Sequence, residues 1–103
     1  MNKKMALVTG ASDGIGLEFC KILAGRGHDL ILVARREQKL QDVARDLSEQ
    51  YKVECIVMTA DLSEPQAAQK LFQRVKIKQL NVNFLVNNAG LLANGSFTDL
   101  DLS

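Results

Sequence analysis

Three glycines occur at a spacing that could bind a phosphate group. Residues 9–16 read Thr-Gly-Ala-Ser-Asp-Gly-Ile-Gly and lie between a short apolar run and a segment of helical periodicity. Gly10 permits a tight turn, Gly14 lets the backbone approach an anion, and Gly16 lets a following helix pack near the preceding strand. The first N–H groups of such a helix lack intrahelical partners, and the helix dipole favours negative charge there. The turn therefore predicts a phosphate or pyrophosphate site, although glycine triplets also close ordinary strand-to-helix turns.

Two arginines follow the next apolar run, where a dinucleotide fold selects its cofactor. A carboxylate about 20 residues after the glycine turn would bind the ribose 2′-hydroxyl of NAD. No carboxylate stands there: the run ends Val33-Ala34-Arg35-Arg36, with Arg35 19 residues after Gly16. The planar guanidinium of Arg35 suits the 2′-phosphate of NADP, so the sequence favours NADP. In the alternative interpretation both arginines are solvated residues that open a helix, although cations there oppose the dipole.

These residues need a sheet that brings their loops together, and the apolar pattern predicts its strands. Short apolar runs of the length of buried strands occur at residues 5–8, 30–34, 53–60 and 84–86. The sequence therefore predicts four strands.

Segments of helical periodicity separate the predicted strands. Apolar residues recur at helical spacing over residues 15–23, before the closing glycines of residues 25–27, and again over residues 40–47, where they alternate with charges. A third helix is expected to start near Glu64, because Ser63 and Gln66 have the spacing of a capping box. The charged residues of the second helix predict a solvated face with pairing between residues three and four apart.

Strands that alternate with helices imply right-handed βαβ crossovers and a parallel sheet covered by helices. We expect an α/β fold, part of a three-layer doubly wound (Rossmann) parallel sheet with strand order 3-2-1-4. If the first two helices pack on opposite sides of this sheet, a ligand binds beyond the carboxyl ends of the first and fourth strands. At 103 residues the chain accommodates one domain, residues 1–103.

A second motif, after the fourth predicted strand, makes the pattern specific. Residues 87–90 read Asn-Asn-Ala-Gly, and the third strand is followed by Asp61-Leu62. With the Thr-Gly-x-x-x-Gly-Ile-Gly pattern of residues 9–16, they resemble the paired fingerprint of the classical short-chain dehydrogenase/reductase (SDR) family. The resemblance covers essentially the whole chain. It implies an NAD(P)-binding domain that is the N-terminal part of a longer SDR fold.

Carried over residue by residue, the resemblance assigns contacts with the dinucleotide. It implies that Ser12 and Ile15 line the pyrophosphate and ribose, that Asp61 and Leu62 flank adenine, and that residues 88–90 approach the adenosine ribose. The predicted cofactor-binding residues are Gly10, Ser12, Asp13, Gly14, Ile15, Gly16, Arg35, Arg36, Asp61, Leu62, Asn88, Ala89 and Gly90.

The resemblance also bears on the choice of cofactor. Family members that prefer NAD carry aspartate at the position of Ala34, whereas many that prefer NADP carry a basic residue just before the second glycine. This sequence departs from the second pattern, because Asp13 stands there. We therefore expect NADP(H) to be preferred over NAD(H), with Arg35 doing most of the selecting.

The residues that perform the family's reaction are not expected in this chain. SDR enzymes transfer a hydride between nicotinamide and a carbonyl or alcohol, using a tyrosine, a lysine four residues later and a serine. The one tyrosine, Tyr51, is followed by Lys52 and lies between the second helix and third strand, so no catalytic residue is assigned. The parent is expected to be an NADP-dependent oxidoreductase and this chain to be inactive alone. The alternatives are a non-catalytic NADP(H)-binding module or an inert fragment.

Composition predicts no further class of partner. Thirteen basic and twelve acidic residues are scattered and nearly cancel, which argues against nucleic acid and membrane surfaces. Cys20, Cys55 and His28 lack the spacing of metal ligands, so no metal site is predicted and both cysteines are interpreted as buried small hydrophobes. The apolar run before Gly10 is too short for a signal peptide, which favours the cytoplasm. An exposed edge of the fourth strand predicts self-association.

Overall fold

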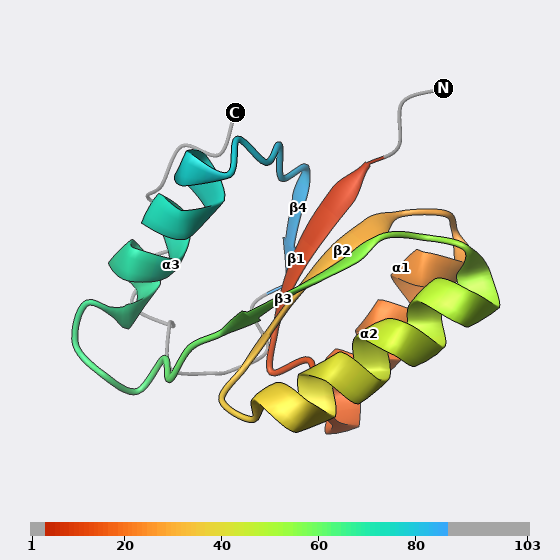
Figure 1. The fold of residues 1–103 in the computed structure, drawn as a ribbon, viewed down its shortest axis with the longest axis horizontal. Coiled ribbons are helices and arrows are strands. Elements are labelled where there is room, and N and C mark those ends of the chain that lie inside the picture. Colours follow the sequence, from red (N-terminus) through yellow and green to blue (C-terminus); the bar gives the residue numbers. More distant parts are fainter. Residues whose placement is uncertain (1–3, 87–103) are drawn as a thin grey trace.

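Four strands and three helices make up the part of the chain that the computed structural model describes, residues 4–86 (Figure 1). In chain order they are β1 (Met5–Thr9), α1 (Gly14–Gly25), β2 (Asp29–Ala34), α2 (Glu37–Tyr51), β3 (Cys55–Thr59), α3 (Ala67–Ile77) and β4 (Phe84–Val86). The strands form one parallel sheet in the order β3-β2-β1-β4. The predicted fold class and strand order are therefore confirmed.

The helices cover both faces of the sheet, but not in the arrangement considered from the sequence. Helices α1 and α2 lie side by side on one face, and α3 covers the other (Figure 1). The sequence-based placement of the first two helices on opposite sides of the sheet was wrong. Two successive right-handed crossovers that move in the same direction, β1 to β2 to β3, leave their helices on one face. The crossover from β3 back to β4 reverses direction and places α3 on the opposite face.

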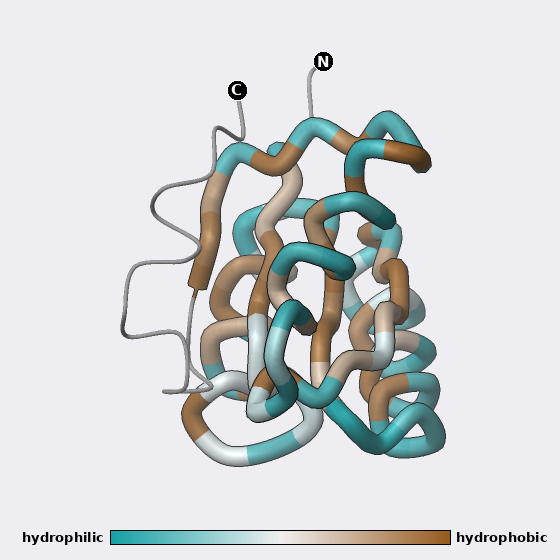
Figure 2. The backbone as a smooth tube through the Cα atoms, turned by 90° about the vertical axis from the view of Figure 1, so that its left-hand side faces the viewer, coloured by the Kyte–Doolittle hydropathy of each residue, from teal (hydrophilic) through white to brown (hydrophobic). Residues whose placement is uncertain are grey.

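The central strands are buried on both faces, which explains their continuous apolar sequence. Val8 and Leu32 face the α1 and α2 side, whereas Leu7 and Ile31 face α3, and all four side chains are fully buried. Figure 2 shows hydrophobic residues along the strands, while hydrophobic and hydrophilic residues alternate along the helices. Burial of these strands holds their carboxyl ends in fixed positions.

Helix α1 packs through small residues. Its buried residues are Gly16, Cys20 and Ala24, four residues apart. Ile15 and Ile22, which contributed to its predicted helical pattern, are 66% and 53% exposed. Gly16 is thus buried at the start of a row of small residues, and such small side chains let a helix approach a sheet closely.

The two cysteines differ in environment. Cys20 is fully buried as predicted, whereas Cys55 is only partly buried. Burial, and after it the neighbouring Cys55 thiol, raises the pKa of Cys20 to about 12. Cys20 therefore behaves as an apolar core residue near neutral pH.

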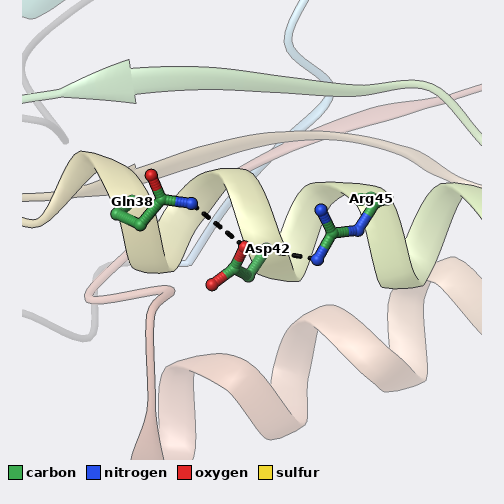
Figure 3. A network of polar contacts seen from close by, with 3 residues as sticks. All are labelled: Gln38, Asp42 and Arg45. Atoms are coloured by element: carbon green, nitrogen blue, oxygen red, sulfur yellow. Dashed lines mark hydrogen bonds and ion pairs between the residues drawn. The ribbon is translucent and has the colours of Figure 1, made fainter.

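The outer face of α2 carries the predicted pairing of polar side chains (Figure 3). Asp42 Oδ1 accepts hydrogen bonds from Gln38 Nε2 at 3.2 Å and from Arg45 Nη2 at 3.3 Å. These partners lie four and three residues from Asp42, as expected for neighbours on one helix face. Contacts between such exposed groups add little to stability.

Helix α3 begins at Ala67, so the expected start near Glu64 was wrong. Ser63 does not cap the helix, because its backbone N–H and its hydroxyl both donate to Asp61 Oδ1. Gln66, the residue before the helix, has a left-handed backbone with φ of 66° and makes no capping bond through its side chain. Local hydrogen bonding to an aspartate has replaced the capping box.

None of the helices between residues 4 and 86 is long and apolar enough to cross a membrane. Within the same residues, no three His, Cys, Asp or Glu side chains lie close enough together to hold a metal ion.

The packing of α3 can be tested with two alanine substitutions in that helix. Leu71 is fully buried against the sheet, whereas Ile77 is 80% exposed. Leu71→Ala should lower the free energy of unfolding by about 2–5 kcal/mol. Ile77→Ala should change it by less than about 0.5 kcal/mol. Urea denaturation followed by circular dichroism measures both, and equal effects would contradict the observed placement of α3.

Candidate functional site

Three loops meet because three neighbouring strands end at the same level. In the parallel register, Thr9 at the end of β1 lies beside Val33, and Ala34 at the end of β2 lies beside Thr59. The carboxyl ends of parallel strands share one edge of the sheet, so the loops that follow them share it too (Figure 1).

Backbone hydrogen bonds continue this alignment into the loops. Ala11 N–H donates to the carbonyl of Val33 at 3.1 Å, which ties the glycine turn to the end of β2. Ala60 N–H donates to the carbonyl of Ala34 at 3.0 Å, which ties the loop after β3 to the same strand. The end of β2 is therefore the central support of the site.

A cavity of about 380 Å³ lies between these loops and is called the strand-end cavity below. It is lined by Gly10, Ser12, Asp13, Val33, Ala34, Arg35, Arg36, Ala60, Asp61, Leu62 and Ser63. The structure thus brings together predicted residues from three separate loops. Four lining residues were not among the predicted site residues: Val33, Ala34, Ala60 and Ser63. The first three carry no polar side chain that could have marked them.

The other predicted residues lie elsewhere. Gly14, Ile15 and Gly16 form the first turn of α1 and do not line the strand-end cavity. Residues 88–90 lie outside the described residues. The end of β4 just before them contacts the end of β1, since the Thr9 hydroxyl donates to the carbonyl of Val86 at 3.4 Å.

The glycine turn has the backbone conformation that its sequence predicts. Gly10 and Gly14 have φ angles of 64° and 60°, in the left-handed region that favours glycine. A Cβ atom added at Gly14 would meet no atom within 4 Å, so its backbone conformation, not crowding, requires glycine. Asp13 precedes α1 and makes no capping hydrogen bond through its side chain. The start of α1 thus keeps the donor character of a helix N-terminus.

Charged side chains of both signs surround the strand-end cavity. Arg35 and Arg36 enter from the β2 loop, whereas Asp13 and Asp61 enter from the loops on either side. The hydrogen bonds from Ser63, and more weakly the positive charge of Arg35, lower the pKa of Asp61. Asp61 therefore remains a carboxylate to lower pH than an ordinary aspartate.

A third cation lies next to the cavity. Lys39 Nζ is 3.5 Å from Asp13 Oδ2, although the two residues are 26 positions apart. From its sequence pattern, Lys39 was expected on the solvated face of the second helix, without a role. The pairing depends on how α2 lies against the glycine turn, and no local sequence pattern shows it.

Comparison with known proteins identifies the family. A family model for short chain dehydrogenase matches residues 4–103. The chain therefore belongs to the short-chain dehydrogenase family, as the two motifs predicted.

Individual relatives include reductases and a protein named inactive. The chain is 43% identical over 88 residues to human inactive hydroxysteroid dehydrogenase-like protein 1, a match that covers 85% of this chain and 26% of the relative. It is 41% identical over 88 residues to the very-long-chain 3-oxoacyl-CoA reductase of Anas platyrhynchos, covering 84% and 27%. The chain thus spans about a quarter of the length of these relatives.

A solved structure shows the same fold with a cofactor. L-sorbose reductase from Gluconobacter frateurii, solved in complex with NADPH and L-sorbose, superposes with a TM-score of 0.79 at 33% identity. The match covers 87% of this chain and 34% of the reductase. A relative with the fold of this chain therefore binds NADPH.

The hydrogen bonds that lower the pKa of Asp61 can be tested at Ser63. Ser63→Ala removes the hydroxyl donor but keeps the backbone donor, so the pKa of Asp61 should rise partway towards its ordinary value. Ser63→Thr keeps a hydroxyl and should leave the pKa low. Titration of the Asp61 carboxyl carbon by NMR measures both, and an unchanged midpoint in Ser63→Ala would contradict the assignment.

Proposed function

We propose that the strand-end cavity holds the adenosine half of NADP(H) for an oxidoreductase of the short-chain dehydrogenase family. The observation that carries the proposal is the meeting of the glycine turn, the Arg35 loop and the Asp61 loop around one cavity. Each loop supplies a different chemistry: backbone donors for a diphosphate, guanidinium groups for a phosphate, and a partly apolar surface for a base.

Each part of the cofactor has proposed partners. Ser12 and the first turn of α1, which includes Ile15, would contact the pyrophosphate and adjoining ribose. Asp61 and Leu62 would flank adenine, and residues 88–90 would approach the adenosine ribose. When bound, the nicotinamide ring supplies or accepts the hydride of the family's reaction.

The choice of NADP over NAD rests on charge at the end of β2. The cavity wall there is Ala34, which leaves room and brings no negative charge, followed by Arg35 and Arg36. A 2′-phosphate can accept charge-assisted hydrogen bonds from a guanidinium, whereas a 2′-hydroxyl gains little from it. We therefore propose that NADP(H) is the preferred cofactor.

The substrate side of the proposal concerns the whole protein. A carbonyl or alcohol substrate follows from the family's chemistry, with the catalytic tyrosine, lysine and serine supplied by residues other than those assigned here. A non-catalytic NADP(H)-binding module is the second candidate, favoured by the similarity to a relative named inactive. Mass spectrometry of the natural protein, compared with its complete coding frame, distinguishes the enzyme from the binding module. A Tyr-x-x-x-Lys downstream of residue 103 supports the enzyme, and its absence supports the module.

The cofactor preference predicts a specific loss at Arg35. The wild-type protein should bind NADP at least about tenfold more tightly than NAD in calorimetry. Arg35→Gln should weaken NADP binding by about 10- to 100-fold and leave NAD binding nearly unchanged. Arg45→Gln, on the outer face of α2, is the matched control and should alter neither affinity. Equal affinities of the wild-type protein for the two cofactors would contradict the role of Arg35.

We also propose that the protein is cytoplasmic.

A further proposal is that this chain self-associates through β4. Among the described residues β4 pairs only with β1, and its Phe84 side chain is 40% exposed. Open strand edges pair with other chains. Light scattering over a range of protein concentrations should show a mass that rises above that of one chain. A constant monomer mass at high concentration would contradict this proposal.

A further inference from the structure

Asp13 is an unfavourable residue for the proposed cofactor. Asp13 lines the strand-end cavity together with Arg35, the residue proposed to hold the 2′-phosphate. Like charges in one cavity repel each other, and the repulsion weakens the attraction that Arg35 exerts on a phosphate. A site that accepts a phosphate beside Asp13 needs a cation to offset that carboxylate.

Lys39 supplies a cation at this position. Its ammonium group is 3.5 Å from the Asp13 carboxylate and reaches it from the first turns of α2. A cation near the N-terminus of a helix opposes the helix dipole, so α2 itself gives no reason for a lysine there. The Asp13 and Lys39 side chains are 71% and 47% exposed, and such an ion pair contributes little to stability. The contact between Lys39 and Asp13 thus fits a role at the cavity better than a role in stabilising the fold.

We propose that Lys39 is a specificity-determining residue for NADP(H), which acts by neutralising Asp13. The inference rests on the proposed function, because it concerns the phosphate that Arg35 would hold. With Lys39 paired to Asp13, the cavity presents Arg35 and Arg36 to the 2′-phosphate, with Asp61 as the only other acidic residue of its lining. Without Lys39, the carboxylate of Asp13 faces the phosphate unscreened.

This mechanism differs from direct phosphate binding in one measurable respect. If Lys39 acts through Asp13, removing its charge weakens binding of the 2′-phosphate only while residue 13 is negatively charged. If Lys39 contacts the phosphate itself, removing its charge weakens binding whichever residue stands at position 13. A double-mutant cycle between the two positions separates these cases.

The experiment uses calorimetry with two probes that differ only in the phosphate of interest. Adenosine 2′,5′-bisphosphate carries the 2′-phosphate and adenosine 5′-monophosphate lacks it. Lys39→Gln should weaken binding of the bisphosphate by about threefold and leave binding of the monophosphate nearly unchanged. In the Asp13→Asn background, Lys39→Gln should change bisphosphate binding by less than about 1.5-fold. Thermal unfolding of each variant checks that these exposed substitutions leave the fold intact.

A matched control comes from α1. Lys21 Nζ lies 3.3 Å from Glu18 Oε2, with side-chain exposures of 49% and 67%, and neither residue lines the cavity. Lys21→Gln removes the same charge from a similar ion pair and should leave both affinities unchanged.

The outcomes separate this inference from the proposed function. If the wild-type protein binds the bisphosphate no better than the monophosphate, the NADP proposal fails and the Lys39 proposal fails with it. If the wild-type protein prefers the bisphosphate but Lys39→Gln leaves that preference unchanged, only the Lys39 proposal is overturned. The same holds if the loss is equally large in the Asp13→Asn background.

Discussion

Parallel pairing of β2 with both β1 and β3 is the constraint on which the candidate site depends. It brings the ends of the three strands to one level, and the hydrogen bonds of Ala11 and Ala60 to β2 extend that alignment into the loops. The strands hold this register because their apolar side chains are buried between α1 and α2 on one face and α3 on the other. The core therefore positions residues that are about 25 positions apart in the sequence around one cavity.

We propose that charge gives that cavity its selectivity for one cofactor. The glycine turn and the start of α1 provide backbone donors that suit any phosphate, and they do not distinguish between the two cofactors. In the proposed function, the distinction comes from the end of β2, where Arg35 follows Ala34 and no carboxylate stands. Asp13 would work against this preference, and the Lys39 ammonium group beside it would offset the negative charge of Asp13. The proposed cofactor choice thus depends on a balance among side chains from two loops and one helix.

The sequence predicted those features that follow from periodicity and from general rules of βα connection. Strand order and the positions of Arg35 and Asp61 are of this kind, because alternating strands and helices leave few arrangements. The shared face of α1 and α2 obeys the same rule of right-handed crossovers, so opposite faces were the wrong expectation for strands in this order. The start of α3 depended on competition for the Ser63 hydroxyl, and the pairing of Lys39 with Asp13 depended on how separate elements pack. Neither contact has a local pattern that reveals it.

We propose that the ends of three strands form one anion-binding cavity, and NMR chemical-shift mapping tests this most directly. Adenosine 2′,5′-bisphosphate should shift the backbone amides of Gly10, Arg35 and Asp61 together along a single saturation curve. The amide signals of α3, such as that of Val75, should not shift, because α3 packs on the face of the sheet opposite α1 and α2. Shifts confined to one loop, or centred on α3, would contradict the account.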